Sequence, residues 1–367
     1  MSSAVVNPVY DAILRELAQE PEGRGMSLPR LGKRLGLGAS VLMRHLTLMG
    51  DAALGGQLGP GWVRVVQADD RWVAHLTEEG FLQCALPPAL VRLPVQRVTQ
   101  TEAGSEQQWL DDTLAAEVPV ALVFNGISHA VMMATPRDLD DFALGFALSE
   151  GILDRADDCF GIEVHAVDAR DAGLPEGMPG IEVRLDIAAR CFERLKGRRR
   201  SMAGRTGCGV CGVESFAALD LQPQPVPPRR WIERIDLPTV LRAFAELPAR
   251  QVLNAEAGAI HAAGWATADG VLQDMLEDVG RHNALDKLIG RLARSGRLVE
   301  AGFVVLSSRG SHELVRKCTR VGIAAMATIS APTAMGVHMA ELNGLRLWGL
   351  CRAPQGVLYT RGLLSNE

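Results

Sequence analysis

The chain lacks the segments that would place it in a membrane or direct it out of the cell. It has no run of about 18 apolar residues, the length that an α-helix needs to cross a bilayer. Its first ten residues have no basic stretch ahead of an apolar core, as a secretory signal would. Its seven cysteines are an odd number without the spacing of a disulfide framework. We therefore expect a soluble, cytoplasmic protein in a reducing compartment, with no membrane contact.

The residues that a zinc site needs are also missing. A structural zinc ion takes four ligands, usually from two closely spaced pairs. Only one CxxC occurs, at Cys208 and Cys211, and no two histidines stand three to five residues apart. A zinc deaminase would need H-x-E followed by P-C-x-x-C, but no H-x-E occurs and Gly207 precedes Cys208. We expect no structural metal.

Length and charge bound the organisation of the chain. Its 367 residues favour two domains, or one large domain with an appendage. The net charge of −5 gives no general reason to expect nucleic acid as a partner. No internal repeat or low-complexity run occurs.

Residues 1–92 read as a separate, small α+β domain that resembles a winged helix. Apolar spacing predicts helices over residues 9–18, after Ser27 and after Ser40, with each serine as a cap. A hairpin is predicted from residues 62–66 and 71–76. Residues 1–95 carry nine basic and nine acidic side chains, whereas a DNA reader gathers positive charge on one face. Protein docking is therefore favoured over DNA binding, and the proline-containing residues 85–94 are the predicted linker.

Residues 93–367 read as a mixed α/β domain. Strands are predicted at 118–125, 130–134 and 181–187, and a helix from about 139 to Gly151. Strands and helices then alternate through the second half of the chain, which favours a layered α/β/α sheet.

The segment Cys208-Gly209-Val210-Cys211-Gly212 carries the strongest chemical signal. Glycines allow the backbone to place two thiols on an exposed loop. The preceding arginines, Arg205 among them, favour the thiolate, which is the nucleophilic form of cysteine. Such a segment suits the movement of sulfur or of electrons.

Polar residues cluster in three further places. Residues 277–287 combine acids with His282 and Asn283 at helical spacing. Residues 307–311, with Ser308 and Arg309, follow a predicted strand and open a helix, as do residues 330–333 with Ser330 and Thr333. Backbone N–H groups and hydroxyls at such helix starts bind anions, and the carboxyl ends of strands in open α/β sheets are where ligands lie. Two such loops predict a phosphorylated ligand. His261 alone is ambiguous.

Together these segments resemble the formate dehydrogenase accessory sulfurtransferase family over about residues 95–360, while residues 1–92 lie outside the family's usual extent. Ala257 and Gly310 stand where Thr and Ala are expected, which are mild departures. The resemblance rests on Asn125-Gly126 with His129, residues 138–146 with Glu150-Gly151, residues 208–212, Gly258 with His261-Ala262-Ala263, residues 277–287, Ser308-Arg309 with Glu313, and residues 330–333.

The resemblance implies a cytidine-deaminase-like fold without zinc, a homodimer, and a specific chemistry. Members of the family take persulfide sulfur from a cysteine desulfurase and deliver it to the molybdenum cofactor of formate dehydrogenase, a bis-molybdopterin guanine dinucleotide. On this basis Cys208 would carry the persulfide and Cys211 would assist. The client cofactor would be bound by His261, His282, Ser308, Arg309, Ser330, Thr333, Leu350, Cys351, Arg352, Ala353, Pro354 and Gln355.

Two other functions stay open at the level of the sequence. One is a non-catalytic chaperone for cofactor insertion, in which the cysteines would be a redox latch. The other is a redox-responsive regulator that acts through the winged-helix-like domain.

Overall fold

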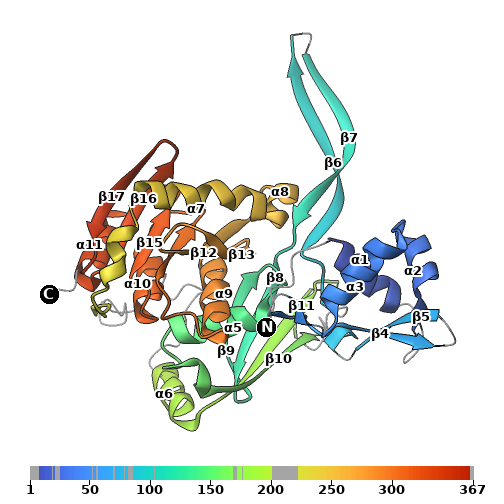
Figure 1. The fold of residues 1–367 in the computed structure, drawn as a ribbon, viewed down its shortest axis with the longest axis horizontal. Coiled ribbons are helices and arrows are strands. Elements are labelled where there is room, and N and C mark those ends of the chain that lie inside the picture. Colours follow the sequence, from blue (N-terminus) through green and yellow to red (C-terminus); the bar gives the residue numbers. More distant parts are fainter. Residues whose placement is uncertain are drawn as a thin grey trace. The chain divides into compact units, whose positions relative to one another are not determined.

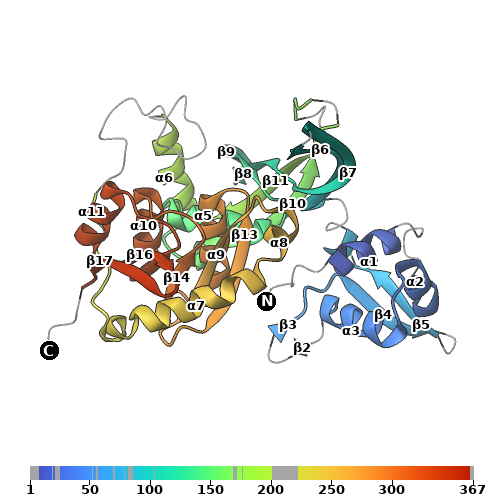
Figure 2. The ribbon, with the colours of Figure 1, turned by 90° about the horizontal axis from the view of Figure 1, so that it is seen from above.

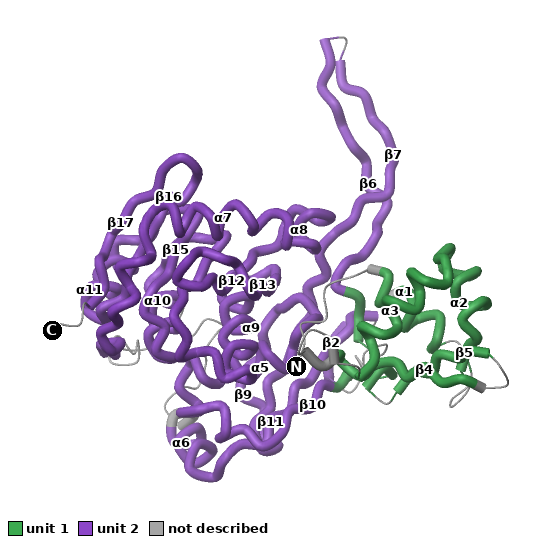
Figure 3. The backbone as a smooth tube through the Cα atoms, viewed as in Figure 1, with its two compact units in different colours: residues 1–88, 165–168 green, residues 89–164, 169–367 purple. Residues whose placement is uncertain are grey.

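The computed structural model describes residues 8–18, 20, 25–51, 53–54, 57–68, 71–77, 79–81, 86–102, 104–167, 172–175, 177–200 and 222–363. The chain divides into two compact units (Figure 3). Residues 1–88 and 165–168 form the first, and residues 89–164 and 169–367 form the second. No described helix is long and apolar enough to span a membrane.

The first unit is a small helical cluster on a three-stranded sheet. Its helices are α1 (Pro8–Ala18), α2 (Leu28–Leu35) and α3 (Ala39–Met49), and its sheet has the order β1 (Met26–Ser27), β5 (Arg71–Leu76), β4 (Val63–Ala68). Ile13, Leu31, Leu42, Leu46 and Met49 are fully buried in its core. The three predicted helices and the hairpin are confirmed, and the assignment to the winged-helix class stays a prediction.

Of the two predicted serine caps of this unit, Ser40 is wrong and Ser27 is confirmed in position only. Gly38, two residues before Ser40, is the N-cap of α3. Ser27 does occupy the N-cap position of α2, but its side chain makes no capping hydrogen bond. Pro29 in the first turn of α2 and the left-handed Gly36 after its end define that helix instead.

The second unit is a mixed α/β structure built on a six-stranded sheet, a four-stranded sheet and a long hairpin (Figure 1). Its elements are β6 (Leu90–Thr101), β7 (Gly104–Ala115), β8 (Val118–Phe124), β9 (Ile127–Ala134), α5 (Leu139–Ser149), β10 (Cys159–Val167), β11 (Gly180–Ile187), α6 (Ala189–Arg200), α7 (Leu237–Arg250), α8 (Val252–Ala257), β12 (His261–Thr267), β13 (Leu272–Asp278), α9 (Arg281–Arg294), β14 (Gly302–Leu306), α10 (His312–Arg320), β15 (Ala325–Thr328), α11 (Ala334–Asn343), β16 (Arg346–Arg352) and β17 (Gln355–Arg361).

The six-stranded sheet has the order β13-β12-β14-β15-β16-β17, with β14, β15 and β16 parallel. Successive side chains of a strand point to opposite faces. Phe303 and Val305 therefore join one core, which α7 covers with Val240 and Phe244, whereas Val304 points to the other face. Helices α9 and α10 lie on that other side of the sheet (Figure 2). The cytidine-deaminase-like order of layers stays a prediction.

The four-stranded sheet has the order β10-β11-β8-β9 and meets the rest of the unit through α5. Asn125 and Gly126 have positive φ angles of 45° and 78°, the backbone conformation of a tight hairpin between β8 and β9. Helix α5 crosses α9 at two glycines. A Cβ on Gly145 would overlap the carbonyl oxygen of Asp286, and a Cβ on Gly290 would overlap that of Asp141. Only glycine permits so close an approach of two helices.

Two predictions about the second unit are wrong. Residues 90–94 of the predicted linker lie in β6, which pairs with β7 over its whole length. The basic stretch before the CxxC was also expected to be a loop, but its residues 194–200 lie in helix α6.

Candidate functional site

The loops that carry most of the predicted ligand-binding residues meet at one edge of the six-stranded sheet. Residues 307–311 follow β14 and residues 329–333 follow β15, and the two strands are parallel. The N–H of Thr333 donates to the carbonyl of Gly310 (3.0 Å), and a Cβ on Gly310 would lie 3.1 Å from Pro332. The two loops are therefore packed together, as the sequence predicts for the carboxyl ends of neighbouring parallel strands.

The segment at the end of β16 joins the same edge. The N–H of Leu350 donates to the carbonyl of Ser330 (3.2 Å), and Leu350 has a positive φ of 53°. Arg352 and Gln355 pair across the turn to β17 and are exposed, as are Ala353 and Pro354. These residues, with Arg309 and Thr333, form an exposed rim around the edge of the sheet.

Two of the predicted residues have buried side chains. Cys351 is 1% exposed and packs in the core under α7, where burial raises the pKa of its thiol to about 12. Ser308 is 5% exposed, and its hydroxyl donates to the carbonyl of Arg309 (3.4 Å). Only the backbone of Cys351 is left to face a ligand at this edge.

Two helices begin at this rim. Thr333 caps α11 by accepting a hydrogen bond from the N–H of Gly336 (3.0 Å), and Ser311 is the N-cap of α10. A helix N-terminus carries unpaired N–H groups and a partial positive charge, so both ends favour an anion.

His261 lies on the neighbouring strand of the same edge. Its Nδ1 is 3.4 Å from the hydroxyl of Ser307, which also accepts the N–H of Ala262 (2.8 Å). Burial lowers the pKa of His261, and the charges of Arg281 and Arg309 lower it further. His261 is therefore a neutral, partly exposed imidazole beside two cations, and not a residue closed off in the core.

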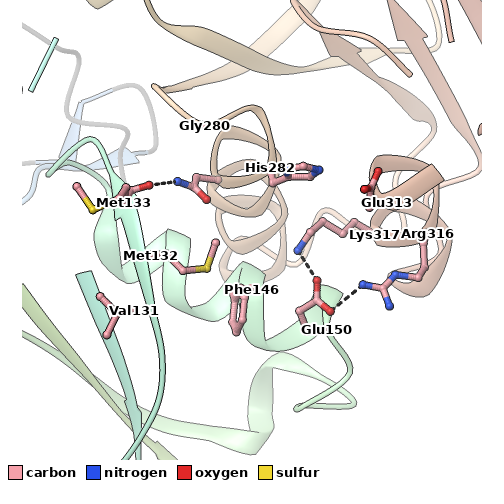
Figure 4. A pocket seen from close by; sticks show the side chains of 11 residues that line it. Val131, Met132, Met133, Phe146, Glu150, Gly280, His282, Glu313, Arg316 and Lys317 are labelled. Atoms are coloured by element: carbon pink, nitrogen blue, oxygen red, sulfur yellow. Dashed lines mark hydrogen bonds and ion pairs between the residues drawn. The ribbon is translucent and has the colours of Figure 1, made fainter. Parts of the chain in front are cut away.

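A cavity of about 310 Å³ lies beside the start of α9 (Figure 4). Val131, Met132, Met133 and Phe146 form an apolar wall, and the remaining lining is Glu150, Gly280, His282, Asn283, Glu313, Arg316 and Lys317. Burial, followed by the charges of Lys317 and Arg281, lowers the pKa of His282 to about 4. Its buried Nε2 has no hydrogen-bond partner among the described residues. His282 is thus a neutral imidazole on the wall of this cavity.

Lys317 ties three helices together behind the cavity. Its Nζ lies 2.9 and 3.0 Å from the two carboxylate oxygens of Asp286 in α9, and 2.8 Å from Glu150 at the end of α5. The hydroxyl of Ser149 is 2.9 Å from the same Nζ and 2.6 Å from Asp286. Figure 4 shows Lys317 and Arg316 reaching from α10 to Glu150. Burial opposes ionisation of Glu150, but the two cations outweigh it and lower its pKa to about 2.

A second buried network holds the turn between β13 and α9. Asp278 accepts the backbone N–H groups of Thr135 (3.0 Å) and Gly280 (2.8 Å), and it pairs with Lys287 (2.7 Å). Asn283 donates to Asp278 (2.9 Å). Asn283, Asp286 and Lys287 are all less than 4% exposed, so residues 277–287 are not a solvated helix face. Most of these polar residues position the backbone, and His282 and Asn283 also line the cavity.

The two cysteines with the strongest chemical signal, Cys208 and Cys211, lie outside the described residues. Of the other cysteines, Cys191, Cys318 and Cys351 are buried and Cys159 is half-buried. Cys191, Asp154 and Asp158 bring three possible metal-ligand atoms close together. Arg190 pairs with Asp158 (2.6 Å) and Arg194 pairs with Asp154 (2.9 Å), so guanidinium groups already neutralise both carboxylates.

Sequence reasoning missed Lys317, Arg316 and the apolar wall of the cavity. Lys317 looks like an ordinary helix lysine, because its partner Asp286 is 31 residues away along the chain. The one weak sign of this network in the sequence was Glu150, an acid directly after a strongly apolar helix.

Comparison with known proteins identifies the chain. Residues 115–363 match the model of the FdhD/NarQ family. The chain belongs to this family. The matched range includes the six-stranded and four-stranded sheets, the cavity and the rim, and leaves out residues 1–88 and almost all of the β6–β7 hairpin.

Relatives carry a consistent description. The chain is 49% identical over 266 residues to the sulfur carrier protein FdhD of Burkholderia mallei. The aligned region covers 72% of the chain and 93% of that protein. It is 52% identical over 259 residues to the protein of the same name from Chromobacterium violaceum, which covers 71% and 92%. A crystal structure of a formate dehydrogenase accessory protein from Desulfotalea psychrophila matches with a TM-score of 0.53 and 22% identity, over 74% of the chain and all of that protein, and supports the fold.

Proposed function

We propose that this protein is a sulfur carrier in the maturation of formate dehydrogenase. It takes persulfide sulfur from a cysteine desulfurase on Cys208 and transfers it to the molybdenum cofactor, bis-molybdopterin guanine dinucleotide, which is its substrate. Membership of the FdhD/NarQ family and the names of relatives about 50% identical support the role of sulfur carrier. The persulfide, the desulfurase and the homodimer are parts of the proposal that follow from the resemblance. The cytoplasmic location rests on the sequence, whose cysteines fit a reducing compartment.

The observation that carries the proposal is the convergence of three loops at one edge of the six-stranded sheet. The N-termini of α10 and α11 open there, beside the exposed Arg309 and Arg352. The cofactor carries two pyrophosphates, and helix N-termini with arginines are suited to phosphates. The residues present therefore fit such a substrate: the rim offers cations and N–H donors, and His261 adds a neutral imidazole.

The proposed chemistry is a transfer of sulfane sulfur between thiolates. The Cys208 thiolate attacks the terminal sulfur of the donor persulfide, so that an S–S bond forms on Cys208 and the donor leaves as a thiolate. If Cys211 then attacks the Sγ of Cys208, the terminal sulfur leaves as hydrosulfide toward the cofactor. The two cysteines become a disulfide by this two-electron oxidation, and an external dithiol must reduce it before the next cycle.

Mass spectrometry of the protein after incubation with a cysteine desulfurase and cysteine tests the sulfur step. We expect a mass increase of one sulfur atom on the peptide that contains Cys208, removed by a reductant. Cys208→Ala should abolish the label and formate dehydrogenase maturation, and Cys211→Ala should lower maturation less. Cys159→Ala, which changes a half-buried cysteine outside the motif, is the control. Full maturation with Cys208→Ala would rule out the persulfide mechanism.

Ligand-dependent stability tests the substrate site separately. A ligand that binds only the folded protein raises its Tm. GDP should therefore raise the Tm, and Arg352→Ala should reduce that rise, because the exposed guanidinium lies on the proposed rim. Arg242→Ala, on the α7 side of the sheet, is the control. Equal stabilisation by GDP and by inorganic phosphate would remove the case for recognition of a guanine nucleotide.

A further inference from the structure

Residues 1–88 form a unit outside the part of the chain that the family shares. The family model matches residues 115–363, and the Burkholderia mallei relative aligns over 93% of its own length with 72% of this chain. What remains of that relative is too short to hold a counterpart of residues 1–88. The activity that the family shares therefore does not require this unit, and the unit is free to serve another contact.

The charge of this unit is unevenly distributed along its chain. Residues 23–50, which contain α2 and α3, carry five basic side chains and no acidic one. Helix α1 neutralises two of the five through ion pairs such as that of Arg34 with Glu16 (2.8 Å). Lys33 and Arg44 are exposed and have no ion pair with any residue that the structure describes. Two positive charges are therefore left at the surface of this helix pair.

The outer side of α3 is apolar around one of these cations. The inner side of the helix is fully buried in the core of the unit, whereas Val41 is 48% exposed and Leu48 is 37% exposed. Their spacing of three and four residues from Arg44 places all three side chains on one face of the helix. Two aliphatic side chains thus flank an unpaired guanidinium in solvent.

Lys33 lies on the neighbouring helix close to this face. Helix α2 packs against α3 at Gly32, where a Cβ would lie 3.7 Å from the side chain of Leu42. Lys33 and Val41 are the sequence neighbours of these two residues. We call Val41, Arg44 and Leu48, together with Lys33, the α3 face.

The α3 face suits an acidic protein surface better than nucleic acid. A DNA reader places hydrogen-bonding side chains at the start of its recognition helix, to reach the edges of bases. Helix α3 starts with Ala39-Ser40-Val41 and offers one hydroxyl there, and two unpaired cations neutralise too few phosphates for tight binding. An apolar patch with two cations beside it instead matches an amphipathic helix that carries carboxylates next to apolar side chains.

We propose that the α3 face binds an acidic amphipathic helix on the surface of the client enzyme, the enzyme that this chain matures. The inference rests on the proposed function, which makes formate dehydrogenase the client. Delivery moves a large cofactor between two proteins, so the complex must outlast a single encounter, whereas the donor step is one exchange between thiol groups. A contact outside the transfer site keeps the client at a high local concentration and slows its loss.

Binding of purified formate dehydrogenase from the same organism to the full chain tests the face. Arg44→Glu reverses a charge on the α3 face. Arg64→Glu makes the same change on β4, where the inward Val63 and Val65 leave Arg64 on the far side of the sheet from the helices. We expect Arg44→Glu and Val41→Glu to raise the Kd at least about tenfold, and Arg64→Glu to change it less than about twofold. Circular dichroism checks that the variants are folded.

The sulfur step is measured on the same preparations by mass spectrometry of Cys208, and all variants should accept sulfur. Normal sulfur on Cys208, with no binding of the enzyme or with equal effects of Arg44→Glu and Arg64→Glu, would overturn the α3 face and leave the proposed function standing. An unchanged protein that accepts no sulfur would refute the proposed function and the choice of client with it. Tight binding of duplex DNA that Arg44→Glu abolishes would assign the face to nucleic acid and overturn the proposal.

A zero-length cross-link tests the chemistry of the partner. The chain has four lysines, of which Lys287 and Lys317 are buried, Lys196 is half-buried and Lys33 is exposed. A carbodiimide activates a carboxyl group, and the amine of Lys33 then attacks it to form an amide while a urea leaves. We expect amides between Lys33 and Asp or Glu side chains of one helix of the client, and their loss with Arg44→Glu. No cross-link at Lys33 in the unchanged protein, or an equal yield with Arg44→Glu, would overturn the proposal.

Discussion

Replacement of Lys317 by Met is the most informative single perturbation of the buried network. The Lys317 side chain is 5% exposed, and its Nζ holds Asp286 at 2.9 and 3.0 Å and Glu150 at 2.8 Å. Methionine keeps most of the aliphatic volume but leaves the fully buried Asp286 with Ser149 as its remaining partner. Removing one member of a buried ion pair costs about 3–5 kcal/mol, because the other charge stays buried without compensation. We expect a loss of unfolding free energy of that size at pH 8.

The loss should shrink as the pH falls. Burial already raises the pKa of Asp286, and the charge of Lys317 lowers it. Without that cation the pKa rises further, so the folded variant takes up a proton at a pH where the unfolded chain does not. The free-energy difference between variant and unchanged protein should therefore be smaller at pH 5 than at pH 8.

Urea denaturation followed by circular dichroism at both pH values measures this difference. Lys196→Met is the matched control, since it removes a half-buried lysine that pairs with the exposed Glu193 in α6 and should cost less than about 1 kcal/mol. The double variant with Asp286→Asn should regain stability at pH 8, because Asp286 no longer leaves a buried charge without a cation, while Glu150 keeps its ion pair with Arg316. A single-variant loss below about 1 kcal/mol with no dependence on pH would refute the reasoning.

Four further outcomes are expected. The pKa of His282 is about 4 in the folded protein and near 6.5 in the unfolded chain. The folded state therefore loses up to about 3 kcal/mol of stability as the pH falls from 6.5 toward 4. His282→Gln should flatten this dependence of the Tm on pH in thermal melts between pH 7 and 4.5. Gly145→Ala should lower the Tm, because overpacking at the helix crossing costs about 1–3 kcal/mol of folding stability. Gly197→Ala in α6, where a Cβ would meet open space, should instead stabilise the fold slightly. A chain that begins at Ala89 should fold and accept sulfur, and loss of folding would contradict this. The full chain should not bind random duplex DNA tightly at about 150 mM salt, and tight binding would contradict this.

The sequence predicted elements wherever apolar spacing was strong. Helix α5 and strands β8, β11 and β14 are almost wholly apolar on their buried sides, and the structure confirms them. The β6–β7 hairpin was missed because β6 and β7 alternate Gln, Thr and charged residues, with a proline inside β6. Those strands face solvent within the chain, and Pro94 stands inside the short apolar alternation of Val91, Leu93 and Val95.

The candidate site was predictable in part, for a geometric reason. Parallel strands bring their carboxyl ends to one edge, and this alone places the loops of Ser308 and Ser330 together. Burial could not be predicted in the same way. Cys351 points into the core because β16 alternates, and Asp286 meets Lys317 only through the crossing of α5, α9 and α10.

The glycine contact between α5 and α9 restricts how the second unit can move. With the carbonyl of Asp286 against Gly145 and the carbonyl of Asp141 against Gly290, neither helix can slide by a residue without driving a side chain into a backbone. Translation of the four-stranded sheet against the six-stranded sheet is therefore blocked, and only a small rocking about the crossing point is left. Any rearrangement that admits a large substrate must come from the loops at the rim. The helices α5 and α9 behind those loops keep their positions relative to each other.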